Sequence, residues 1–138
     1  MSWFLGKKFK RVRCENIDEL LNSTNASEEV IRFLKGSPPT ISFTKIDDIN
    51  FMFTLEADKK HHSYMFKVGE VNEVQRRDGS KIEVLYQLES DNIMKQTIRM
   101  PHGKTACFTR EFSETGAKMT VELEGSSIKG TIYYEVVE

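Results

Sequence analysis

Residues 16–35, NIDELLNSTNASEEVIRFLK, form the only stretch of this sequence with the apolar spacing of an α-helix. The turn residues at positions 22–25 divide this stretch into two short helices. After Pro38 and Pro39 the pattern changes to short runs in which apolar and polar residues alternate, as they do in β-strands. Helices this short need a surface to pack against. The chain is therefore predicted to be a β-structure with one helical insert packed at its mouth.

The two predicted helices have separate start signals. Asn16 is predicted to cap the first helix, with Glu19 as its partner in a capping box. The second helix is predicted to start near Ser27 and to end at residues 35–36, Lys-Gly. Its apolar stripe is predicted to serve as lid packing, with some of its side chains touching a ligand: Val30, Ile31, Phe33 and Leu34.

Ten strands are predicted from the alternation and from the turn residues that separate most of the runs. They are Lys7–Cys14, Ile41–Lys45, Asn50–Glu56, Ser63–Lys67, Glu70–Val74, Lys81–Leu88, Ile93–Met100, Thr105–Phe112, Lys118–Leu123 and Ser127–Val136. Short turns between them imply an antiparallel, up-and-down order, and closure into a barrel would remove the sheet edges. The predicted fold class is therefore all-β, a ten-stranded barrel with a helix-turn-helix lid between the first two strands. A barrel of this width should enclose a cavity for a small molecule.

Length and composition exclude several classes of protein. The 138 residues predict one domain spanning residues 1–138, and a net charge of −1 gives no overall attraction to nucleic acid. No apolar run approaches the roughly 18 residues of a membrane span, and the N-terminus lacks the apolar core of a signal peptide. A cytoplasmic location is expected. Cys14 and Cys107 fit it as reduced packing residues, although the sequence leaves a disulfide between them open.

The predicted strand Thr105–Phe112 carries the strongest functional signal. Its one face bears an arginine, Arg110, between Phe108 and Phe112. Such a face suits a cavity that binds an acid with an apolar tail, and the alternative is a core arginine paired with Glu122 or another acid. No phosphate-binding loop, nucleophile motif or metal cluster is present, so neither enzymatic activity nor a cofactor or metal site is expected.

The sequence resembles the intracellular lipid-binding protein family, which includes fatty-acid-binding and cellular retinoid-binding proteins. The resemblance rests on the order and spacing of several motifs along nearly the whole chain. These are residues 7–10 (KKFK) and 15–21 (ENIDELL), Pro39-Thr40, residues 66–70 (FKVGE), residues 109–111 (TRE) and Ile132-Tyr133. It implies a lipid-binding barrel whose helix-turn-helix covers the portal.

In this family two arginines and a tyrosine typically hold a ligand carboxylate. The resemblance assigns the first arginine to Arg110 and the tyrosine to Tyr133. The second arginine is replaced by Thr131, which keeps a hydroxyl on the face of Tyr133. Lys129, two residues further back, could supply the missing cation. Arg11 stands where the family usually has an inward apolar residue, so it either points into the cavity or marks a shift in register.

The portal departs from the family pattern because Lys59 occupies a position where a phenylalanine is common. Together with Lys60, His61 and His62 it forms either a patch for transient contact with anionic membranes or a solvated turn. The predicted function is that of a monomeric carrier of a long-chain fatty acid or similar hydrophobic acid. The alternatives are a bulkier ligand, such as a retinoid or bile acid, and a structural or interaction role without a lipid.

Overall fold

The computed structural model describes residues 4–24, 31, 34–35, 40–57, 60–75, 79–100 and 103–137. In this part of the chain the strands are β1 (Lys8–Glu15), β2 (Thr40–Lys45), β3 (Asn50–Ala57), β4 (Lys60–Lys67), β5 (Val71–Gln75), β6 (Lys81–Ser90), β7 (Ile93–Arg99), β8 (Thr105–Phe112), β9 (Gly116–Leu123) and β10 (Lys129–Val137). The helix α1 (Ile17–Asn22) follows β1.

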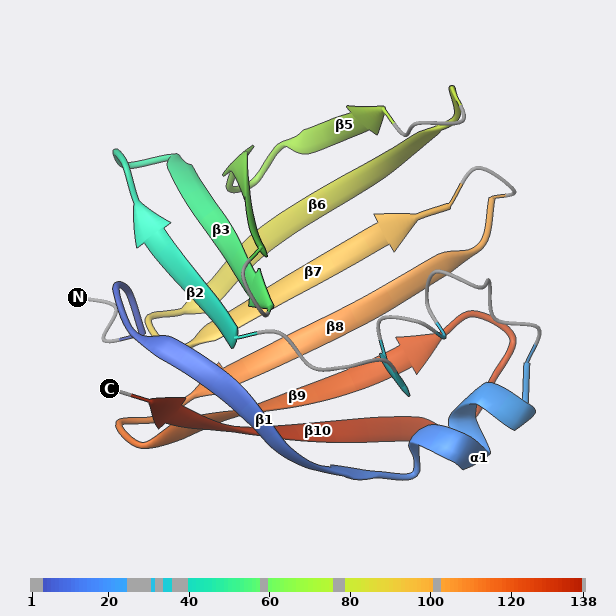
Figure 1. Ribbon diagram of the computed structural model, residues 1–138. Helices are drawn as coiled ribbons and strands as arrows, with labels where there is room; N and C mark the ends of the chain where they lie inside the picture. The colour runs from blue at the N-terminus through green and yellow to red at the C-terminus, as the bar shows by residue number, and fades with distance from the viewer. Residues whose placement is uncertain are drawn as a thin grey trace.

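All ten strands belong to one antiparallel sheet in the order β4-β3-β2-β1-β10-β9-β8-β7-β6-β5. Each strand pairs with a sequence neighbour, and β1 pairs with β10. The sheet curls into a barrel whose edge strands, β4 and β5, are not hydrogen-bonded to each other (Figure 1). The predicted ten-stranded up-and-down barrel with a helix after its first strand is confirmed. No helix in the described ranges is long and apolar enough to cross a membrane.

Two strands begin at least two residues earlier than the sequence pattern predicts. β4 begins at Lys60 instead of Ser63, because its ladder with β3 continues to the pair formed with Ala57. β9 begins at Gly116 instead of Lys118, since its ladders with β8 and β10 extend past the polar end of the run. In both places pairing with a neighbouring strand orders residues whose own side chains carry little strand signal.

The inner face of the barrel holds the core. On β8 the alternate residues Ala106, Phe108, Arg110 and Phe112 are buried, so the predicted shared face of this strand is confirmed. Phe4 stacks on Phe112 with 4.2 Å between the ring centroids, which brings the segment before β1 against the inner face. Alternation with a period of two thus places an arginine among aromatic rings.

The helix α1 begins differently from the prediction. Asn16 does occupy the N-cap position, but its backbone is left-handed with φ of 59° and its side chain makes no capping hydrogen bond. The predicted capping box with Glu19 is therefore wrong. The chain must turn sharply from β1 into the helix, and asparagine tolerates this left-handed conformation better than most residues. The predicted early end is confirmed, since α1 stops at Asn22.

Helix α1 packs against β10 through its apolar side. Ile17 and Leu20 are buried there, above Gly130. A Cβ atom on Gly130 would lie 2.6 Å from Cδ1 of Ile17, so the glycine provides the space for this contact. The hydroxyls of Ser23 and Ser126 are in contact beyond the end of the helix. The second predicted helix lies largely outside the described residues, of which 31, 34 and 35 are helical.

A β-bulge interrupts β1. Arg11 pairs with Tyr134 of β10, and Arg13 pairs with Tyr133, so Val12 has no partner in the register. A bulge places two residues of one strand opposite one position of its neighbour and increases the local twist. The faces of β1 before and after Val12 must therefore be assigned from the observed pairs.

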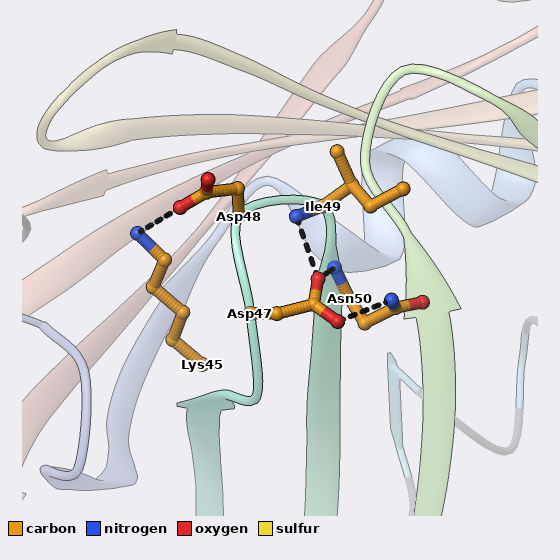
Figure 2. Close-up of polar contacts among 5 residues, drawn as sticks. All are labelled: Lys45, Asp47, Asp48, Ile49 and Asn50. Carbon is orange, nitrogen blue, oxygen red and sulfur yellow. Dashed lines mark hydrogen bonds and ion pairs between the residues drawn. The ribbon is translucent and has the colours of Figure 1, made fainter.

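The turn between β2 and β3 is organised by one carboxylate (Figure 2). Asp47 accepts hydrogen bonds from the main-chain N–H of Ile49 at 3.0 Å and of Asn50 at 2.9 Å, and from the side-chain amide of Asn50 at 2.7 Å. The Asn50 side chain is the largest cause that holds the pKa of Asp47 below its ordinary value of 3.8. Asp48 only approaches Lys45, at 3.8 Å, and is fully exposed.

Asp47→Ala is therefore expected to lower the urea midpoint at about pH 7, where the carboxylate is ionised in both states. Because its folded pKa lies below the unfolded value, the stability from Asp47 is present above 3.8 and is lost as pH falls through the folded pKa. The difference from wild type should shrink toward about pH 3. Asp48→Ala is the matched control and should leave the urea midpoint unchanged at both pH values. An equal loss at both pH values would contradict the carboxylate's role.

Candidate functional site

Arg110 is the only buried charged residue among those the structure describes. Its side chain projects from β8 and is 2% exposed. Nη1 donates a hydrogen bond of 2.6 Å to Oε1 of Gln96 on β7, and Gln96 is itself buried. Nε is buried without a hydrogen-bond partner. The guanidinium carbon lies 5.6 Å from the ring centroids of both Phe43 and Phe53, at the outer limit of useful cation–π contact.

The charge of Arg110 is not neutralised by a carboxylate of the described chain. Glu122, the partner considered from the sequence, lies on the other face of the sheet and pairs with Lys129 at 3.2 Å. Burial lowers the pKa of Arg110, and the phenols of Tyr134 and Tyr86 oppose this shift to a smaller extent. A buried cation without an anion is unfavourable, so negative charge beside Arg110 would stabilise the barrel.

Two tyrosines accompany Arg110 on the inner face. Burial raises the pKa of Tyr86 to about 12 and also raises the pKa of Tyr134, whereas the charge of Arg110 lowers both. Both phenols consequently keep their protons at neutral pH and can donate hydrogen bonds. A guanidinium with two phenolic donors is suited to bind the oxygen atoms of an acid.

The inward tyrosine of β10 is Tyr134, and the orientation predicted for Tyr133 is wrong. Tyr134 is buried and lies opposite Ala117 and Arg11, whereas Tyr133 is on the outer face. There the guanidinium carbon of Arg13 lies 3.9 Å from the Tyr133 ring centroid. Both Tyr133 and Tyr134 line an open hollow near the β8–β9 turn.

The same correction applies to the other two predicted residues of β10. Thr131 and Lys129 alternate with buried residues and share the outer face with Tyr133. The inner position two residues before Tyr134 is Ile132, which supplies no cation. Because side chains alternate, choosing the wrong member of the Tyr133–Tyr134 pair turned all three assignments outward.

Comparisons with known proteins find similarity to fatty acid-binding proteins. No protein-family model matches the chain. A fatty acid-binding protein of Tyrophagus putrescentiae is 26% identical over 121 residues, which cover 88% of this chain and 90% of that protein. The liver fatty acid-binding protein of Schroederichthys bivius is 26% identical over 88 residues, covering 64% of this chain and 69% of its own.

Solved structures extend the likeness to the whole barrel. The Schistosoma mansoni fatty acid binding protein in complex with arachidonic acid has a TM-score of 0.78 and 25% identity, and the match covers 100% of this chain and 98% of that one. The chain is therefore similar to fatty acid-binding proteins in both sequence and fold. The fatty acid-binding protein of Manduca sexta, with 21% identity, a TM-score of 0.77 and coverage of 96% and 98%, shows the same fold.

Arg11 lies directly before the bulge of β1. Arg11 shares the face of Tyr134, with which it pairs, and the bulge at Val12 shifts the register directly after it. Its Nη1 donates a hydrogen bond of 2.7 Å to the main-chain oxygen of Leu34. Arg11 therefore joins the barrel wall to the helical insert. Its contact with a ligand stays a prediction.

The predicted portal residues are only partly described. Leu34 is 2% exposed and belongs to the core, whereas Ile31 is 39% exposed. Lys35 forms an ion pair of 2.8 Å with Asp18 of α1. Val30, Phe33 and Lys59 lie outside the described residues, and Lys60 is described only as the first residue of β4. The membrane contact predicted for this basic stretch, which includes the exposed His61 and His62, stays a prediction.

Sequence reasoning missed three inward residues of the site: Gln96, Tyr86 and Tyr134. A signal for the last was present, since Ile132, Tyr134 and Val136 form an apolar alternate set while Lys129, Thr131 and Glu135 form a polar one. For Gln96 the only signal is its place between the apolar residues Met94 and Ile98 on one face of β7. That position predicts burial, but it does not predict a bond to Arg110.

Proposed function

We propose that this protein is a carrier that binds a long-chain fatty acid, or a similar hydrophobic carboxylic acid, inside its barrel. The observation that carries the proposal is Arg110, a buried guanidinium with an unpartnered Nε and no carboxylate partner among the described residues. A ligand carboxylate would neutralise this charge and accept from the free donor. The names of the relatives in Tyrophagus and Schroederichthys support the same ligand class.

The apolar tail and the head group contribute differently to binding. Burial of roughly 15 methylene groups gains on the order of 12 kcal/mol, at about 0.8 kcal/mol each. Association costs about 4–15 kcal/mol, and a charge-assisted hydrogen bond adds about 1.5–3 kcal/mol. The tail therefore provides most of the affinity. The head-group contact with Arg110 determines the orientation of the ligand and the preference for acids.

Titration of delipidated protein with oleate in an isothermal calorimeter tests the proposal. Saturable binding of one oleate per chain is the expected result. Competition of a fluorescent fatty acid against oleate, a retinoid and a bile acid then separates the proposed ligand from a bulkier one. Delipidated protein that binds none of these would overturn the proposal and favour a structural or interaction role.

We also propose where the ligand passes and where the carrier acts. The ligand would enter beside the part of the helical insert that is held by the Arg11–Leu34 hydrogen bond and the Lys35–Asp18 ion pair. Cys14 and Cys107 are free thiols, which suits a reducing compartment such as the cytosol, where we propose that the carrier acts. It releases its ligand chemically unchanged.

Two adjacent tyrosines offer a matched test of the inner site. Tyr134→Phe is expected to weaken oleate binding about three- to tenfold, because one hydrogen-bond donor to the carboxylate is lost. Tyr133→Phe should leave oleate binding unchanged, since that ring lies outside the barrel against Arg13. Calorimetry of both variants measures the difference. Loss of affinity in Tyr133→Phe alone would reverse the assignment of the two tyrosines.

A further inference from the structure

We propose that Gln96 is a positioning residue that determines the class of ligand by holding Arg110 without neutralising it. The inference rests on the proposed function, because it concerns the same inner site. Gln96 projects inward from β7, where Tyr86 and Phe108 are its partners on the neighbouring strands. It is 8% exposed, so its amide is removed from water almost as completely as the guanidinium.

The hydrogen bond between the two residues leaves one edge of the guanidinium available. Gln96 Oε1 accepts from Nη1 of Arg110 at 2.6 Å, whereas Nε has no partner. The guanidinium of Arg110 makes no other hydrogen bond in the part of the chain that the structure describes. The edge formed by Nε and Nη2 can therefore meet both oxygens of a carboxylate in a bidentate pair.

The neutrality of the amide is the second part of the inference. Glutamate has the same length as glutamine and would place a carboxylate at the same distance from Nη1. That carboxylate would satisfy the charge of Arg110 from within the protein, and an anionic ligand would then meet a neutral pair. Glutamine provides the acceptor that fixes the guanidinium and leaves its full charge for the ligand.

The test compares oleate with oleyl alcohol, which has the same tail without the charge. Calorimetric dissociation constants are measured for wild type, Gln96→Glu, Gln96→Leu and Gln87→Glu. Gln87 is exposed on the outer face of β6, so Gln87→Glu adds the same negative charge outside the barrel. Wild type is expected to prefer oleate by about tenfold or more, the effect of a charge-assisted bond.

In Gln96→Glu the preference for oleate should fall at least about tenfold, while the affinity for oleyl alcohol changes less than about threefold. Gln96→Leu, which removes the acceptor without adding charge, should reduce the preference about threefold and serves if the glutamate variant does not fold. Gln87→Glu should match wild type. If both Gln96 variants keep the wild-type preference for oleate over oleyl alcohol, the role of Gln96 is overturned and the proposed function is unaffected. Wild-type protein that binds no oleate would overturn the proposed function itself, and the role of Gln96 with it.

Discussion

Arg110→Met is expected to stabilise the ligand-free protein by about 1–4 kcal/mol and to remove its preference for carboxylates. The guanidinium is buried with an unpartnered donor and no described counter-ion, so the folded state bears a desolvation cost that methionine does not. Burial lowers the pKa of Arg110 in the folded state. Folding therefore disfavours the protonated guanidinium. The resulting loss of stability is fully present at neutral pH and decreases only as pH rises through the folded pKa.

Urea unfolding with and without oleate measures both effects. Wild type should gain about 2.7 kcal/mol of stability at an oleate concentration one hundred times its dissociation constant, and Arg110→Met should gain less. The free energies of unfolding of wild type and Arg110→Met are expected to converge or cross as oleate is added. Arg99→Met, at an exposed arginine of β7, is the matched control and should stay within about 0.5 kcal/mol of wild type. Ligand-free Arg110→Met that is less stable than wild type would show that the guanidinium is satisfied inside the barrel.

Gly116→Ala is expected to destabilise the protein by about 3 kcal/mol. A Cβ atom at this position would lie 2.2 Å from the main-chain oxygen of Tyr134 and 3.3 Å from its carbonyl carbon. Backbone atoms cannot rotate away, so β9 and β10 would have to separate where the ladder between them ends. Tyr134 would move with β10, and oleate binding should weaken as well.

Gly130→Ala provides the comparison within the same pair of strands. Its Cβ atom would come too close only to the side-chain tips of Ile17 at 2.6 Å and Leu20 at 3.2 Å, which can rotate, since the main-chain oxygen of Asn16 at 3.7 Å is at ordinary contact distance. We expect a loss of about 1 kcal/mol, confined to the packing of α1 on β10. Urea unfolding of both variants gives the two values. A Gly116→Ala loss no larger than that of Gly130→Ala would show that the β9–β10 ladder can shift without cost.

The number, order and direction of the strands could be predicted from the sequence. Alternation of apolar and polar residues reports which side chains face inward, and turn residues report where strands stop, and both signals are local. The same local pattern placed Arg110 on one face between Phe108 and Phe112. It also ended α1 at the turn cluster after Asn22.

Only the tertiary structure decided which groups meet inside the barrel. Strand pairing selected Tyr134 over Tyr133 and created the bulge at Val12, because register depends on partners distant in the sequence. The sharp entrance of the chain into α1 placed Asn16 in a left-handed conformation and prevented its side chain from capping. The register between β7 and β8 placed Gln96 diagonally beside Arg110, whereas Glu122 pairs with Lys129 on the other face of the sheet. The sequence alone thus determined that the barrel holds an arginine, and the packed strands determined that no described carboxylate pairs with it.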